Sequence, residues 1–241
     1  MPAGLRRGRG RRSRPGLTRR YDVVTFDCYG TLVDWESGIG GWFEQAARAD
    51  GLSLERKQIL PAYAEIEPAV EAETYRSYRD VLTEAALRVA KRLGWPLTPE
   101  KARGLADSLP DWKPFPDTNP ALERLVAAGH RLGILSNVDD DLLAGTRRHF
   151  AVAFDLIVTA EQVRSYKPTP GHFEEARRRI GASRWLHAAQ SHFHDVVPCR
   201  ILGIPVAWVN RKREPTRSEV HPDFEVPNLS ELAESLDASS G

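Results

Sequence analysis

The sequence has no apolar run near the roughly 18 residues that a membrane-spanning helix requires. It has only two cysteines, Cys28 and Cys199, which argues against a disulfide scaffold and is typical of a reducing cytosol. We therefore expect a cytoplasmic protein that makes no contact with a membrane. The hydrophobic content of 41% is sufficient for a substantial core in a chain of 241 residues.

Acidic residues are absent from the first twenty positions, where eight arginines gather. Removing their charge from the net +1 leaves about −7 for the rest, so nucleic acid is not an expected partner. Residues 1–20 carry too little apolar surface to fold, which predicts a disordered basic tail. Two other interpretations are an arm for nucleic acid or a membrane surface, and a signal peptide, although no apolar stretch follows the arginines.

The most informative segment is residues 23–32, in which an apolar β-branched run ends at Asp27 and turns at Gly30. Such a run is typical of a strand buried on both faces of a parallel sheet. Ligands in open α/β sheets bind beyond the carboxyl ends of the strands, which is where Asp27 lies. Further strands are predicted at residues 131–135, 154–158, 185–189 and 205–209, with an edge strand at 224–226.

Residues 35–116 have helical rather than strand patterns. One helix is expected to begin at Ser53 and to break or kink at Pro61 and Pro68, and another to run from about Glu71 to Leu93. The polar side chains here are interpreted mainly as a solvated face, with a position in a pocket as the alternative. They are Glu65, Glu67, Glu71, Glu73, Tyr75 and Tyr78.

Four segments in order resemble the motifs of the haloacid dehalogenase superfamily. They are Asp-Cys-Tyr-Gly-Thr-Leu at 27–32, Ser-Asn at 136–137, Lys-Pro at 167–168, and the region after the strand at 185–189, which contains Asp195. The resemblance implies an α/β fold with a three-layer, Rossmann-like parallel sheet as its core, residues 21–34 and 117–241. It also implies an inserted all-helical cap, residues 35–116, which closes over the site and excludes water.

The resemblance also implies roles for the motif residues. Asp27 is the covalent nucleophile, and Thr31 and Lys167 hold its carboxylate. Lys167 is expected to keep Asp27 ionised and to lower its pKa. Ser136 and Asn137 are expected to donate hydrogen bonds to the substrate carboxylate or to an oxyanion.

Two departures from the superfamily's phosphatases indicate the chemistry. Tyr29 stands where those enzymes have the Asp that protonates an alkoxide, and a halide needs no such proton. Gln190 stands where they have a metal-binding Asp, with Asp195 at the second acid, which weakens a Mg²⁺ site. We predict a hydrolase of carbon–halide bonds that converts a short 2-haloacid to a 2-hydroxy acid through an aspartyl ester, without metal or cofactor.

The substrate-facing positions depart from the L-2-haloacid dehalogenases as well. Those enzymes have an arginine early in the second cap helix, but residues 60–67 contain none, and Arg56 is the candidate replacement. Gln190, His192 and His194 stand where they have Ser, Asn and Trp.

Three interpretations of the two histidines stay open. They orient a water near Asp195, they are structural, or they form a transition-metal site with Asp195, which lacks a fourth ligand.

Two other functions remain. One is a Mg²⁺-dependent small-molecule phosphatase of the same superfamily, and the other is a non-catalytic binding protein that has kept the fold. In each case we expect a small-molecule partner, and a homodimer is left open.

Overall fold

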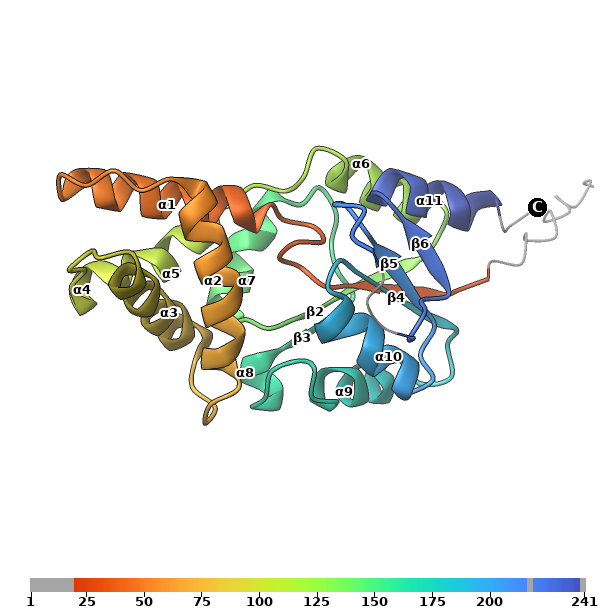
Figure 1. Cartoon of the computed structure of the whole chain (residues 1–241). Coiled ribbons are helices and arrows are strands. Elements are labelled where there is room, and N and C mark those ends of the chain that lie inside the picture. The colour runs from red at the N-terminus through yellow and green to blue at the C-terminus, as the bar shows by residue number, and fades with distance from the viewer. Residues whose placement is uncertain (1–19, 216–218, 239–241) are drawn as a thin grey trace, which may run out of the picture.

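The computed structural model describes residues 20–215 and 219–238. Its centre is a six-stranded, fully parallel sheet with the order β3-β2-β1-β4-β5-β6 (Figure 1). The strands are β1 (Val23–Phe26), β2 (Arg131–Ser136), β3 (Leu156–Thr159), β4 (Trp185–Ala189), β5 (Val206–Val209) and β6 (Phe224–Val226). The α/β fold with a parallel sheet is confirmed.

Helices cover both faces of the sheet and complete three layers. On one face α6 and α11 pack together, and on the other α9 and α10 cover residues of β1, β2 and β4 (Figure 1). The helices of this part are α6 (Thr118–Ala127), α7 (Asp140–Thr146), α8 (Ala160–Val163), α9 (Gly171–Ile180), α10 (Val197–Ile201) and α11 (Leu229–Ala238). Burial of the strands from both sides explains their continuous apolar sequence.

Between β1 and α6 the chain contains only helices, which lie together at one end of the sheet (Figure 1). They are α1 (Trp35–Ala49), α2 (Arg56–Glu71), α3 (Tyr78–Arg92), α4 (Pro99–Ala102), α5 (Gly104–Ser108) and the 3₁₀ turn Leu109–Asp111. The helical cap is thus present, while its exact limits at residues 35 and 116 stay a prediction.

The expected helix start at Ser53 and the expected break at a proline are wrong, while a kink at either proline stays a prediction. Helix α2 begins at Arg56 behind a capping box of Glu55 and Gln58, and it continues through both Pro61 and Pro68. Its buried apolar face offsets the hydrogen bonds that the two prolines remove.

The next helix starts later than expected, at Tyr78, because the Ser77 side chain caps it by accepting from the Asp80 N–H. Glu71 is therefore the last residue of α2 and not the first residue of α3.

The arginine-rich tail lies outside the described residues, apart from Arg20. In the described ranges, no helix has the length and apolar character needed to cross a membrane.

Candidate active site

The site lies at the carboxyl ends of β1, β2 and β4. Phe26 at the end of β1 pairs with Ile134 on one side and Ala188 on the other, so the following residues of all three strands meet at one edge. A cavity of about 230 Å³ separates this edge from the cap, and helices α1 and α2 supply part of its wall. Polar side chains from both parts of the chain therefore face one cavity.

Asp27 is the first residue after β1 and is only 9% exposed. Its Oδ2 accepts a hydrogen bond from Thr31 Oγ1 at 2.9 Å, and its Oδ1 accepts one from Lys167 Nζ at 2.9 Å. The turn from Asp27 to Thr31 needs Gly30, whose φ is +98° and at which a Cβ would lie 3.2 Å from the side chains of Gln190 and Trp35. The turn holds the carboxylate at the cavity wall.

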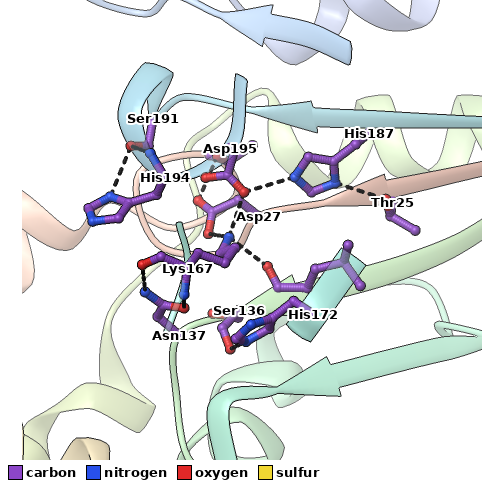
Figure 2. Close-up of polar contacts among 12 residues, drawn as sticks. Thr25, Asp27, Ser136, Asn137, Lys167, His172, His187, Ser191, His194 and Asp195 are labelled. Atoms are coloured by element: carbon purple, nitrogen blue, oxygen red, sulfur yellow. Dashed lines mark hydrogen bonds and ion pairs between the residues drawn. The ribbon is translucent and has the colours of Figure 1, made fainter. Parts of the chain in front are cut away.

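Lys167 is the cation of the site and is 1% exposed. Its ammonium group donates to Asp27 Oδ1, to Asp195 Oδ1 at 2.6 Å and to the Leu135 carbonyl at 2.9 Å (Figure 2). Asn137 fixes its backbone, because the Asn137 side chain accepts from the Lys167 N–H and donates to the Lys167 carbonyl. Three acceptors thus engage all three N–H groups of the ammonium.

Lys167 acts on the pKa of Asp27 in the expected direction, but the net shift of that pKa is upward. Burial raises the pKa of Asp27, and although Lys167 and Thr31 act to lower it, Asp195 adds to the rise. For Asp195 the balance is opposite, because Lys167 and His187 overcome the effect of burial and hold its pKa well below the usual carboxyl range. Of the two carboxyl groups that share Lys167, Asp195 is therefore the one whose pKa is lowered, while that of Asp27 is raised.

A chain of buried hydrogen bonds supports Asp195 from behind (Figure 2). Trp185 Nε1 donates to Thr25 Oγ1 at 2.7 Å, and Thr25 Oγ1 lies 2.8 Å from His187 Nδ1. His187 Nε2 lies 2.9 Å from Asp195 Oδ1. If the His187 ring carries its proton on Nε2, Thr25 Oγ1 donates to Nδ1 and Nε2 donates to Asp195 Oδ1, so each contact joins a donor to an acceptor. Asp195 Oδ2 has no hydrogen-bond partner among the described residues.

Ser136 and Asn137 follow β2 and reach the cavity as expected. The Ser136 hydroxyl, 1% exposed, makes no hydrogen bond within the described part of the chain, so it is available to a ligand. The Ser136 carbonyl lies 3.1 Å from His172 Nε2, which anchors the strand end. Asn137 Nδ2 also faces Glu71, at 3.1 and 3.3 Å from its two oxygens.

Tyr29 and Gln190 line the cavity at the positions where the sequence departs from a phosphatase. Tyr29 Oη is 2.9 Å from Thr146 Oγ1, and its ring meets Trp112 edge to face. Gln190 is placed by its backbone, which donates to Thr31 Oγ1 and accepts from Trp208 Nε1.

The two histidines of the fourth motif point to different places. His194 lines the cavity, with Nδ1 3.0 Å from Ser191 Oγ and Nε2 4.0 Å from Glu71 Oε2. His192 does not line it, since its Nε2 bonds the Val220 carbonyl and its ring packs on Trp208. The expected contact of His192 with substrate or water is therefore wrong. The π-helical turn His192–Val196 separates the two rings.

Arg56 does not replace the missing cap arginine. It is largely exposed, its Nε bonds Glu44, and it is not among the lining residues. Glu67, Glu71 and Tyr78 do line the cavity, so the preferred interpretation of a solvated face is wrong for these three. Of the remaining candidates, Glu65 and Glu73 form exposed ion pairs and Tyr75 stacks on Tyr166.

Sequence reasoning missed several residues of the cavity wall and of its support. The cap contributes Trp35, Tyr63 and Trp112, and the strand β4 contributes His187 behind Asp195. One signal was present, because Tyr63, Glu67 and Glu71 are spaced four apart and therefore share one helix face.

A Mg²⁺ ion does not fit these residues well. Gln190 offers a neutral amide where a second carboxylate would be required, and Asp195 Oδ1 already accepts from Lys167 and His187. Within residues 20–215 and 219–238, no three His, Cys, Asp or Glu side chains are grouped as metal ligands.

Comparisons with known proteins agree with this geometry. The family model for haloacid dehalogenase-like hydrolases matches residues 21–189. An (S)-2-haloacid dehalogenase of Pseudomonas putida is 28% identical, covering 87% of this chain and 94% of its own. Haloacid dehalogenase-like hydrolase domain-containing protein 3 of Danio rerio is 33% identical, and the match covers 87% of this chain and 93% of that protein.

The fold has solved counterparts. The structure of an L-2-haloacid dehalogenase from Xanthobacter autotrophicus, with chloropropionic acid covalently bound, superposes with a TM-score of 0.77. The match covers 90% of this chain and 98% of that one. At 23% sequence identity it shows that the two proteins share a fold. With the family model matching most of its length, the chain belongs to the haloacid dehalogenase-like hydrolases.

Proposed function

We propose that this protein hydrolyses the carbon–halogen bond of a short 2-haloacid and releases a 2-hydroxy acid and halide. The observation that carries the proposal is the carboxylate of Asp27, held by Thr31 and Lys167 at the wall of the cavity between sheet and cap. Tyr29 stands where a general acid would be needed for an alkoxide, and halide leaves without one. The relatives from Pseudomonas putida and Pseudomonas fluorescens that are named (S)-2-haloacid dehalogenase support the same reaction.

In the first step, a carboxylate oxygen of Asp27 attacks the halogen-bearing carbon and forms an ester as the carbon–halogen bond breaks. The electron pair of that bond leaves with the halide. A single displacement of this kind inverts the configuration at the carbon. Ser136, whose hydroxyl has no other hydrogen bond in the described chain, is placed to receive the substrate carboxylate.

In the second step, water attacks the carbonyl carbon of the Asp27 ester, and the bond from that carbon to the product oxygen breaks. The carboxylate of Asp27 is restored, and the product oxygen takes up one proton of the attacking water and leaves as the hydroxyl group of the 2-hydroxy acid. Asp195 is the candidate acceptor of the water proton, because its Oδ2 is buried at the cavity wall without a hydrogen-bond partner among described residues. Gln190 lies at the same wall and is placed to orient the water. Neither step requires a metal or an organic cofactor.

Chloride release from chloroacetate and from L- and D-2-chloropropionate tests the proposal, with and without EDTA. We expect release that EDTA leaves unchanged and that Asp27→Asn lowers by at least about 10³-fold, because an amide cannot act as the nucleophile. Circular dichroism of the variant is the control for folding. Release only with Mg²⁺, or release that persists in folded Asp27→Asn, would contradict the proposal.

A further inference from the structure

The cap presents carboxyl groups to the cavity instead of a cation. Glu67 and Glu71 lie one turn apart on α2, and both line the space that Asp27 and Asp195 face from the sheet. Four acids therefore share one small cavity. Two of them belong to the proposed hydrolytic reaction, which leaves the two cap acids without a role.

No lysine or arginine of the described residues pairs with the cap acids. The nearest basic group is His194, whose Nε2 lies 4.0 Å from Glu71 Oε2, and burial lowers the pKa of this imidazole, which favours its neutral form. The only lysine at the cavity is Lys167, whose three N–H groups are engaged by Asp27, Asp195 and the Leu135 carbonyl. No arginine belongs to the described residues that line it.

Both cap carboxyls are held in place by neutral groups. Tyr78 Oη donates to Glu67 Oε1 at 2.9 Å, and Asn137 Nδ2 donates to Glu71. Burial raises the pKa of both groups, with that of Glu67 at about 7, and the interaction between them adds to the rise for Glu71. A positively charged ligand beside these two carboxyl groups would favour their ionised form and would be attracted by it.

The rest of the cap wall is also suited to a cation. Trp35 and Tyr63 lie with ring centroids 5.8 Å apart, and both rings line the cavity. Aromatic faces attract ammonium groups, most strongly where water is excluded. The hydroxyl of Tyr63, a residue 4% exposed and one turn before Glu67, interacts with Tyr78, and no donor of the described residues lies within hydrogen-bond distance of its oxygen. It is a buried acceptor available to an ammonium donor.

We propose that this wall receives an ammonium group, so that the preferred substrate is a short 2-haloacid with an amino group at the end away from its carboxylate. The inference rests on the proposed function and names its substrate class. The substrate carboxylate lies toward Ser136, and the ammonium lies toward Glu67 and Glu71. For the shortest example, 3-amino-2-chloropropionate and water give 3-amino-2-hydroxypropionate, chloride and a proton.

The test compares substrates of nearly equal shape. In 2-chlorobutyrate a methyl group replaces the ammonium of 3-amino-2-chloropropionate, and 2-chloropentanoate with 4-amino-2-chlorobutyrate forms a longer pair. Chloride release is measured for each. We expect kcat/KM to be at least tenfold higher for the amino member of at least one pair. Equal values in both pairs, or higher values for both methyl members, would overturn the inference.

Variants on one helix locate the effect. Glu67→Gln and Glu71→Gln should each lower, at least tenfold, the ratio of kcat/KM for the preferred amino substrate to kcat/KM for its methyl partner. Glu65→Gln is the matched control, because Glu65 lies on the exposed side of α2 and pairs with Arg92. A loss of the same size for both members of the pair would contradict an ammonium site and indicate a general effect on the cavity.

Binding of a product gives a readout that does not depend on turnover. Quenching of tryptophan fluorescence by 3-amino-2-hydroxypropionate should saturate at concentrations at least tenfold lower than with 2-hydroxybutyrate. The two hypotheses fail differently. Absence of chloride release from every haloacid would refute the proposed function, whereas release that favours 2-chlorobutyrate and 2-chloropentanoate would refute only the ammonium site.

Discussion

Lys167 is the residue on which the buried charges of the site depend. Its ammonium lies between Asp27 and Asp195, and all three side chains are almost completely shielded from water. Removal of one partner from a buried ion pair leaves the other charge uncompensated, which costs far more than the pair itself contributes. Lys167 and the two carboxylates therefore depend on one another, and the loss of Lys167 leaves both carboxylates buried without a counter-charge.

Lys167→Met should lower the free energy of unfolding by about 3–5 kcal/mol, because two buried carboxyl groups lose their counter-charge. Urea denaturation measures this difference. Lys57→Met is the control, since Lys57 is exposed and its loss should change stability by no more than about 0.5 kcal/mol. Equal stability of the Lys167 variant and the wild type would show that the ion pairs do not hold the site together.

The pH dependence of activity should reflect the ionisation of Asp27. Burial raises the pKa of Asp27 above its ordinary value of 3.8, and only the ionised form is a nucleophile. The rate of the first step should therefore fall as the pH is lowered through this raised pKa. Thr31→Val should move the midpoint upward, because it removes a hydrogen bond that favours the ionised form. An unchanged midpoint would argue against the role of Thr31.

The sequence predicted the placement of the motif residues better than that of their neighbours. Asp27, Ser136 and Lys167 follow predicted strands, and parallel strands bring such residues to one edge. His192 and His194 are two residues apart, and the turn that separates their rings has no recognisable pattern in the sequence. The sequence placed His187 in a buried strand but did not indicate its role, because Asp195 comes into contact with it only in the folded protein.

Among the helices, α1 packs closely against the cavity wall because Gly38 has no side chain. A Cβ added at Gly38 would lie 2.4 Å from the ring of Trp112, which lines the cavity and packs on Tyr29. Gly41, in the same helix, has only Arg56 Nη2 nearby, at 4.0 Å. The two glycines therefore form a matched pair for testing this contact.

Gly38→Ala should lower the free energy of unfolding by about 1–3 kcal/mol, since Trp112 must move. Gly41→Ala should raise it by up to about 1 kcal/mol through helix propensity alone. Thermal or urea denaturation of both variants makes the comparison. If Gly38→Ala were as stable as Gly41→Ala, close packing of α1 on Trp112 would be contradicted.

Helix α2 should make stability depend on pH through Glu67. Burial raises the pKa of Glu67 in the folded protein from 4.5 to about 7, so the folded state holds a proton that the unfolded state has lost. Its stabilising effect is complete below pH 4.5 and is lost as the pH rises to about 7. Glu67→Gln should therefore gain stability relative to wild type over this interval. The free energy of unfolding of Glu65→Gln should follow the pH in the same way as that of wild type. The same parallel course for Glu67→Gln would show that the pKa of Glu67 is not raised.

The cap was the part of the fold least accessible to prediction. Its helical character followed from apolar spacing, but Pro61 and Pro68 suggested breaks where burial of one face keeps α2 continuous. The orientation of Glu67 and Glu71 depends on how α2 packs against α1 and α3. A polar residue on a helix does not indicate by itself which side faces a pocket.

At the scale of the whole molecule, the sheet and the cap divide the proposed reaction between them. The sheet positions Asp27, Lys167 and Asp195 beyond the ends of its strands, and the cap encloses the space in front of them. The order of motifs along the chain was enough to predict the fold and the family, because strand ends recur at fixed places in this topology. The group that the substrate presents to the cap depends on contacts between distant segments, such as Asn137 with Glu71.

A single turnover in H₂¹⁸O, with enzyme in excess over 2-haloacid, shows whether Asp27 is the nucleophile. If Asp27 forms the ester and water attacks its carbonyl carbon, the label enters the carboxylate of Asp27, and the product carries unlabelled oxygen from the enzyme. Mass spectrometry of the peptide containing Asp27 and of the hydroxy acid distinguishes the two locations. Label in the product with an unlabelled Asp27 would show direct attack by water and would contradict the nucleophilic role of Asp27.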